Sequence, residues 1–191
     1  MPSIMPFDEL NQLTTRVRER YGSEMLKPSD QYEDILDEMF DLFLLAYAQG
    51  NTVTQENLAY LAPDKDFQNP TIDEVLEVVN KKVADKTWEE RTRDWFVNGG
   101  SVEDIVRVIE TETHRIANSS ALRTAKKIGA KSKTWSTMLD DKVRDTHSPL
   151  EGETIPIDED FYTWDDDHAS APGMFELPQN NINCRCELIF S

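Results

Sequence analysis

The two cysteines of the chain lie one residue apart, in the segment "NINCRCELIF". If this segment is a strand, Cys184 and Cys186 point to the same face. Their Cα atoms would then lie about 6.6 Å apart, so a disulfide between them would be strained. The thiols could be small buried residues of a core, or they could be half of a tetrahedral zinc site. The zinc site would need His147 and one further group, for which the candidates are His168, Asp140 and Asp145.

A second group of reactive side chains follows the pattern D-x-x-x-R-x-x-H within "KTWSTMLDDKVRDTHSPLEGETIPI". If that segment is helical, Asp140, Arg144 and His147 share one face at i, i+4 and i+7. Asp140 and Arg144 could then form an ion pair that holds the loop before Pro149. His147 could be a metal ligand, a proton carrier, or a hydrogen-bonded residue that anchors the turn.

The alternating pattern continues beyond the cysteines. Leu188 and Phe190 have the same parity as the two thiols, so this face is predicted to be a core face. We therefore expect both thiols to face inward near His147. Arg185 is predicted to lie on the opposite face, where it can pair with Asp141 or with the acidic loop.

The same residue types could serve an enzyme. A nucleophilic cysteine with a histidine base needs the two side chains within hydrogen-bond reach, which a sequence does not show. The carboxylates of "WDDDH" could hold Mg²⁺ in a small metal-dependent hydrolase or nuclease, or they could form a solvated acidic loop. Phosphate chemistry is disfavoured, because residues 131–191 hold 5 basic and 13 acidic residues, a net charge of −8.

The acidity of the whole chain limits its partners. Its 191 residues carry a formal net charge of −17, with 38% hydrophobic and 30% charged residues. Such a protein repels nucleic acid and anionic membranes on average. No apolar run approaches the roughly 18 residues of a membrane span, and the N-terminus lacks a signal-peptide pattern. We therefore expect a soluble protein that first meets a reducing cytoplasm.

Helical spacing marks the first part of the chain. Apolar residues from Tyr32 to Tyr47 recur at helical intervals, and Gly50 is the predicted helix end. Extra leucines widen this apolar face, so we expect it to pack on two neighbours or on another chain.

Three further helix starts carry the capping-box pattern, in which a Thr or Ser is followed three residues later by an acid. They are "TIDE" at 71–74, "TWEE" at 87–90 and "SVED" at 101–104. The last of them is predicted to open a long helix that runs to about Lys127 and ends at Gly129.

Strand-like composition replaces helical periodicity after Gly129. The segments "KTWSTML", "ETIPI" and "CRCELIF" are predicted to be extended, and "DEDFYTWDDDHASAPG" is predicted to be a loop. The predicted fold class is α+β. An N-terminal helical bundle over residues 1–130 would precede a small mixed α/β C-terminal module over residues 131–191, which contains a terminal β-strand.

Basic residues gather where the two parts meet. No acid occurs from Thr113 to Leu139, but six basic residues do: Arg115, Arg123, Lys126, Lys127, Lys131 and Lys133. A locally basic segment could contact nucleic-acid phosphates or an acidic partner. Alternatively, these cations could lie near a helix C-terminus, where the helix dipole favours them.

Two motifs in fixed order carry a family resemblance. The pattern K-x-W-x-x-x-x-D-x-x-x-R-x-x-H-x-x-x-x-G, followed by a Pro-containing acidic loop and N-C-R-C, resembles the phage Mu protein F-like family, which includes head-morphogenesis proteins of the SPP1 type. The matching residues are Lys133, Trp135, Asp140, Arg144, His147, Gly152, Asn183, Cys184, Arg185 and Cys186. The preceding "IETETHRIANSSALRTA" also resembles the family, at Glu110, Glu112, Arg115 and Asn118. The resemblance covers roughly residues 102–190.

The resemblance implies a minor head protein of a tailed phage, located in the virion at the capsid interior or portal vertex and assembled in the host cytoplasm. Such proteins associate with the portal and other head proteins, and assist head assembly or genome delivery. Contact with packaged DNA would be weak. The resemblance implies no catalytic role and no cofactor, although zinc remains an open interpretation. Some relatives carry this domain beside toxin domains, so an effector-delivery module is an alternative.

Overall fold

The computed structural model describes residues 3–22, 25–27, 32–63, 69–83 and 85–191. The helices in these residues are α1 (Phe7–Tyr21), α2 (Glu33–Leu58), α3 (Ile72–Val79), α4 (Trp88–Asn98), α5 (Val102–Ile128) and α6 (Pro178–Asn181), with 3-10 turns η1 (Ala59–Leu61) and η2 (Ser148–Leu150). The strands are β1 (Ser132–Ser136), β2 (Thr154–Pro156), β3 (Phe161–Tyr162), β4 (His168–Ala169) and β5 (Glu187–Phe190). The predicted α+β fold class is confirmed. In the part of the chain that the structure describes, no helix has the length and apolar character needed to cross a membrane.

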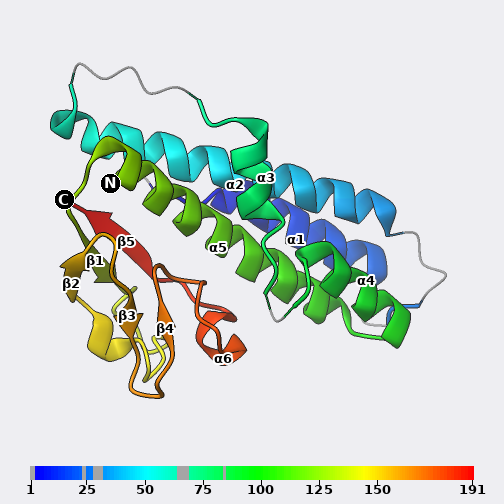
Figure 1. Cartoon of the computed structure of the whole chain (residues 1–191). Helices are drawn as coiled ribbons and strands as arrows, with labels where there is room; N and C mark the ends of the chain where they lie inside the picture. The colour runs from blue at the N-terminus through cyan, green and yellow to red at the C-terminus, as the bar shows by residue number, and fades with distance from the viewer. Residues whose placement is uncertain (1–2, 23–24, 28–31, 64–68, 84) are drawn as a thin grey trace.

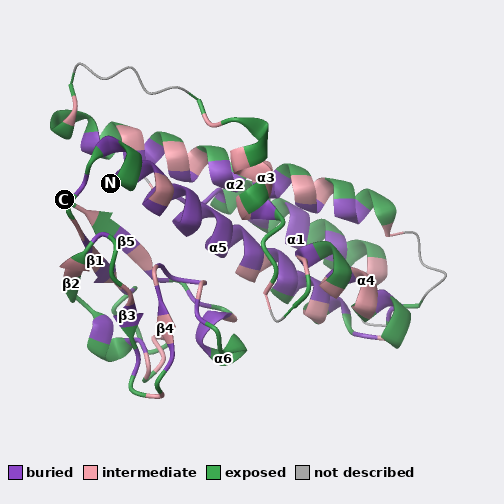
Figure 2. Cartoon of the chain, viewed as in Figure 1, coloured by how far each residue is buried: buried purple, intermediate pink, exposed green. Residues whose placement is uncertain are grey.

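Helix α5 is the central element of the molecule. It lies along α1 and α2, which pack against each other, and it also contacts β5 of the C-terminal part (Figure 1). Every residue from Glu112 to Leu122 is buried, so this stretch is covered on all sides (Figure 2). A helix covered all round must pair its polar side chains inside the protein. One such pair is the hydroxyl of Ser120, which donates to the Tyr47 carbonyl oxygen of α2 at 2.7 Å.

The long α2 corrects one predicted boundary. Gly50 was expected to end this helix, but α2 continues to Leu58. The reason is a close helix crossing, because a Cβ atom at Gly50 would lie only 2.4 Å from the carbonyl oxygen of Ala117 in α5. The glycine therefore allows close approach of two helices and does not act as a stop. The wide apolar face of α2 packs within the same chain, on α1, α3 and α5.

The predicted helix starts of α3, α4 and α5 are confirmed. Thr71 and Thr87 each accept a hydrogen bond from the backbone N–H of the glutamate three residues later, and each glutamate accepts from the threonine backbone N–H. At Ser101, the Asp104 carboxylate accepts from the serine backbone N–H at 2.8 Å. Gly129 ends α5 in the left-handed region, at φ 106°, as predicted.

Three of the strands form an antiparallel sheet in the order β2-β1-β5. Trp135 of β1 stands opposite Leu188 of β5, and Lys133 stands opposite Ile155 of β2. Strand β5 is shorter than predicted, because it begins at Glu187, after both cysteines. The acidic segment expected to be a loop contains the hairpin of β3 and β4.

Two hydrophobic clusters make up the core. The first lies among the helices and includes Phe43, Phe96 and Ile109. The second lies under the sheet, around Trp135 and Phe161, and it takes in residues from the ends of α2 and α5. These helical contributors are Leu58, Leu122, Ala125 and Ile128.

Candidate functional site

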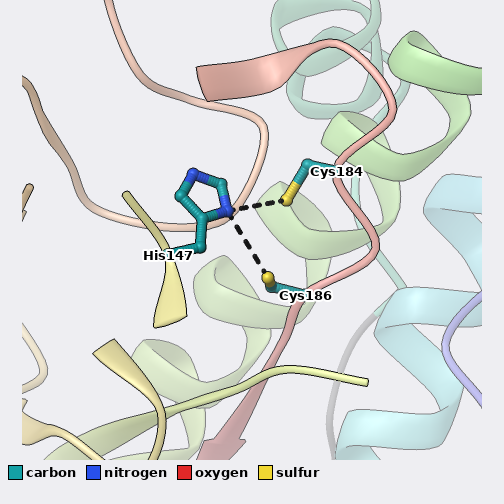
Figure 3. A group of neighbouring side chains, drawn as sticks. All are labelled: His147, Cys184 and Cys186. Carbon is teal, nitrogen blue, oxygen red and sulfur yellow. Dashed lines mark hydrogen bonds between the residues drawn. The ribbon is translucent and has the colours of Figure 1, made fainter. Parts of the chain in front are cut away.

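Three side chains from two distant segments meet in the C-terminal part of the molecule. The Sγ atoms of Cys184 and Cys186 both lie 3.6 Å from Nδ1 of His147, and the two sulfurs approach this nitrogen from different sides (Figure 3). All three residues are buried, and neither cysteine is in a disulfide. The prediction that both thiols face inward near His147 is therefore confirmed.

Aromatic rings fix the orientation of the His147 imidazole. Phe175 stacks on it at a centroid distance of 5.2 Å, and Trp135 meets it edge-on at 5.4 Å. Among the described residues, the buried Nε2 atom has no hydrogen-bond partner. The nitrogen that faces polar atoms is thus Nδ1, which points at the two sulfurs.

The segment that carries His147 is not helical, so the condition for a shared face is not met. Residues 140–147 form bends and turns, because Leu139 takes a left-handed φ of 54° and the Asp140 carboxylate accepts from the backbone N–H of Lys142. Such local side-chain hydrogen bonds compete with helix formation. Asp140 and Arg144 consequently do not share a helical face.

Asp140 pairs with a different arginine from Arg144, the partner that a helix would have allowed. Asp140 instead accepts two hydrogen bonds from the Arg185 guanidinium, at 2.7 and 2.9 Å. These hydrogen bonds hold the pKa of the Asp140 carboxyl below its usual value. Arg185 had been expected to face Asp141 or the acidic loop, so it lies on the predicted side of the segment but takes a neighbouring partner.

Arg144 holds the chain that leads into the cysteines. Its guanidinium donates to the carbonyl oxygens of Asn180 and Ile182. The hydroxyl of Thr146 donates to the side-chain oxygen of Asn180 at 2.8 Å. The turn before η2 is therefore tied to the segment just before Cys184, which places His147 beside the sulfurs.

Helix α5 contributes a second histidine, His114, which the sequence alone does not single out. Nε2 of His114 lies 2.7 Å from the carbonyl oxygen of Cys186. Because a carbonyl oxygen only accepts, this nitrogen carries the proton. Burial lowers the pKa of His114 to about 4, which keeps the ring neutral. The available signal was the spacing of His114 and Asn118, one helical turn apart, since the Asn118 amide also donates to the Cys186 carbonyl.

The pKa values of the two thiols are shifted in opposite directions. The hydrogen bond from Cys186 is the main cause that lowers the pKa of Cys184, with smaller contributions from the positive charges of Arg144 and Arg185. The same hydrogen bond, followed by burial, raises the pKa of Cys186. Cys184 is therefore the thiol that loses its proton more readily.

The other predicted fourth groups lie outside this cluster. His168 stacks on Tyr162, and its Nε2 lies 4.0 Å from the Asp160 carboxylate. The Asp145 carbonyl oxygen accepts from the indole of Trp164. Among the described residues, the sole group of three or more metal-ligating side chains in mutual reach is His147, Cys184 and Cys186.

The carboxylates of "WDDDH" hold loops together. Asp167 is buried and accepts from the backbone N–H groups of His168, Glu176 and Leu177. Asp165 accepts from the hydroxyl of Thr163 at 2.5 Å.

Two residues of the family motif, Gly152 and Asn183, have left-handed backbone conformations. Gly152 has a φ of 74°, and its N–H donates to the Trp135 carbonyl oxygen at 2.9 Å. Asn183 takes a φ of 58° directly before the cysteines. Both conformations lie in the left-handed region, which glycine and asparagine tolerate best.

The predicted basic run is divided between buried and surface positions. Arg115 is buried, pairs with Glu112 at 2.8 Å and donates to backbone carbonyls at the end of α3. Lys133 is buried and donates to the Ser170 carbonyl oxygen at 2.8 Å. Lys131 is exposed. The remaining three cations each contact a carboxylate: Arg123 with Glu77, Lys126 with Asp158 and Lys127 with Glu74.

Comparisons with known proteins extend over most of this architecture. The model of the family described as Phage Mu protein F like protein matches residues 74–189. The minor head protein GP7 of Bacillus phage SPP1 is 37% identical over 84 residues, which cover 42% of this chain and 27% of that protein. The NAD(+)--arginine ADP-ribosyltransferase EFV of Enterococcus faecalis (strain ATCC 700802 / V583) is 29% identical over 151 residues, which cover 61% of this chain and 31% of that protein. The chain thus spans less than a third of the length of either relative. No solved structure matches the chain.

Proposed function

Because the chain belongs to the family of Phage Mu protein F like proteins, we propose that it is a phage minor head protein that assists head assembly at the portal. The observation that carries this proposal is the family match over residues 74–189, joined by the 37% identity to a minor head protein. The matched region runs from α3 to β5, so it includes both the enclosed helix and the cysteine cluster. The proposed location is the virion, at the capsid interior or portal vertex.

We assign portal docking to the helical part, residues 1–130. The wide apolar face of α2, which first suggested a docking role, is mostly used inside the molecule, since Met39, Phe43 and Ala46 are fully buried. Apolar side chains that remain exposed near the end of α2 and the start of α3 are better placed for a partner. They are Tyr60, Leu61 and Ile72, with exposed fractions of 66%, 39% and 63%.

Co-purification with the cognate portal protein tests this assignment. A variant with Tyr60→Ser, Leu61→Ser and Ile72→Ser should lose the portal, because these side chains supply the exposed apolar contact. A matched variant of the β3–β4 hairpin, Tyr162→Ser with Trp164→Ser, removes two aromatic residues of similar exposure and should keep it. Loss of the portal with the hairpin variant alone would move the docking surface to the C-terminal module.

Contact with packaged DNA is a minor part of the proposal. Arg123, Lys126 and Lys127 already face carboxylates, so their charge is largely balanced on the surface. We expect any binding to be weak and to disappear as salt is raised.

The similarity to an enzyme of Enterococcus faecalis favours a second candidate role, as a delivery module of longer proteins with other activities. The chain matches only 31% of that relative, which leaves room there for further segments. Mass spectrometry of purified particles separates the roles. A chain found in assembled heads supports the head role, whereas a chain found only as part of a larger, separately secreted protein supports delivery.

A further inference from the structure

The separations from the His147 Nδ1 atom to the two cysteine Sγ atoms fit the edges of a metal tetrahedron. Zinc is bound at about 2.3 Å by sulfur and about 2.0–2.1 Å by nitrogen, so tetrahedral angles place the two ligand atoms about 3.6 Å apart. Both separations between His147 Nδ1 and the cysteine Sγ atoms are 3.6 Å. The three ligand atoms all lie within 4.8 Å of one another.

The direction of the imidazole supports the same assignment. One Nδ1 atom faces two sulfurs at the same distance, whereas a single N–H group points along one line only (Figure 3). A cation placed between the three atoms satisfies all of them at once. One imidazole with two thiolates is a donor set that zinc prefers over calcium or magnesium, which take oxygen ligands.

Hydrogen bonds from other parts of the chain hold the backbone around the two cysteines in place. The His114 ring on α5 donates to the Cys186 carbonyl oxygen, and Arg144 holds the carbonyl oxygens of Asn180 and Ile182 before Cys184. The imidazole of His147 is held between aromatic rings. The charge of a divalent ion balances the two thiolates, and Arg185 next to them is already paired with Asp140.

We propose that His147, Cys184 and Cys186 bind one zinc-class divalent metal ion, with the fourth position open to a water molecule. A small pocket reaches the three ligands between Met138, Val143 and Asn183, with room for about one water molecule. The bound ion would fasten the turn before η2 to the segment that enters β5. This inference does not depend on the proposed head role, because it concerns only the donor atoms of the chain.

Cobalt substitution of the full chain tests the proposal. The protein is purified, reduced, freed of metal with a chelator, and titrated with Co²⁺ alone. We expect one Co²⁺ per chain, with the thiolate-to-cobalt charge-transfer absorption and the visible bands of tetrahedral Co²⁺. Added Zn²⁺ should abolish these bands by displacing the cobalt. Elemental analysis of the protein as purified should give one equivalent of zinc.

Matched variants place the ion. Cys184→Ser, Cys186→Ser and His147→Gln should each lose the cobalt bands, whereas His168→Gln should retain them because this histidine lies outside the cluster. Circular dichroism reports whether each variant is folded. If a variant is unfolded, the test uses the unmodified chain instead. The intensity of its charge-transfer absorption must then correspond to two thiolates bound to each cobalt ion.

Absence of cobalt bands in the folded, reduced chain would overturn the proposal. Bands that persist unchanged in both cysteine variants would do the same, since the ion would then be held elsewhere. Both results would leave the cluster as a hydrogen-bonded pair of thiols on a histidine.

Discussion

Arg144 and Arg185 lie close together but in different surroundings. Arg144 is half-buried and donates to two backbone carbonyl oxygens, whereas Arg185 forms an exposed ion pair with Asp140. Hydrogen bonds from a charged group to otherwise unpaired carbonyls stabilise a fold more than a surface ion pair does. The D-x-x-x-R-x-x-H motif therefore depends on its arginine for structure, through contacts that lie 36 and 38 residues further along the chain.

We expect Arg144→Gln to lower the free energy of unfolding by about 1.5–3 kcal/mol, because the carbonyl oxygens of Asn180 and Ile182 lose a charged donor. Arg185→Gln is the matched control and should change it much less. Urea denaturation followed by tryptophan fluorescence measures both. Equal losses in the two variants would show that Arg144 contributes no more than a surface ion pair.

Lys133 gives the C-terminal module a pH dependence on the alkaline side. Burial lowers the pKa of this lysine to about 8, although its ammonium group donates to Ser170 and lies 5.5 Å from the centre of the Phe161 ring. In the unfolded chain this lysine has a pKa of about 10.4. Between the two pKa values the unfolded chain therefore binds more protons than the folded protein does. Stability should therefore rise with pH, by about 2 kcal/mol from about pH 7.5 to about pH 9.5.

The variant Lys133→Met should flatten this rise, because the titrating group is gone. Lys131→Met, at an exposed position of the same segment, should leave it unchanged. Urea denaturation at a series of pH values measures the slopes. A slope that is the same in all three proteins would assign the pH dependence to other groups.

At the scale of elements, the crossing of α2 and α5 is the most demanding contact. Gly50→Ala should lower the free energy of unfolding by about 1–3 kcal/mol, because the added methyl group meets the Ala117 carbonyl oxygen. Helix propensity alone predicts the opposite sign, a gain of about 0.5–1 kcal/mol. Ala48→Gly, at an exposed position of α2, is the control that measures the difference in helix propensity between alanine and glycine. A stabilised Gly50→Ala protein would mean that the two helices separate at little cost.

Local signals explain which elements the sequence could predict. The capping boxes at Thr71 and Thr87 and the glycine after α5 act within one helical turn, so their consequences are visible in a short window. The end of α2 was mispredicted because the role of Gly50 depends on a residue 67 positions away. The turn at Asp140 is not visible in the sequence because it depends on a hydrogen bond from the Lys142 backbone N–H group to the Asp140 carboxylate, which helical periodicity does not reveal.

The candidate site was predictable in part for the same reason. Parity along the terminal segment placed both thiols on the buried face, and the zinc interpretation named His147 as their neighbour. The partners that hold the cluster were not predictable, since His114 and Arg144 act through backbone carbonyl oxygens. Every residue has a backbone carbonyl oxygen, so the residue types of a sequence do not show which of these oxygens accepts a hydrogen bond.

At the scale of the whole molecule, the division near residue 130 stays a prediction. The cluster beneath the sheet includes Leu122, Ala125 and Ile128 of α5, together with Leu58 of α2. We therefore expect residues 131–191 alone to lack a cooperative unfolding transition and to lose the near-ultraviolet circular dichroism of buried Trp135. The full chain is the control. A cooperative transition in the fragment would show that the module folds by itself.

The enclosed stretch of α5 implies an order of events during synthesis. A chain emerging from the ribosome can cover one side of Glu112–Leu122 with α1 and α2, both of which are made before it. The other side, which includes His114, stays exposed to solvent until the cysteine segment has been synthesised, more than sixty residues later. During that interval the nascent protein presents a half-polar helix face to the solvent. Chaperones that recognise such faces would have their longest access to this protein just before its last strand pairs.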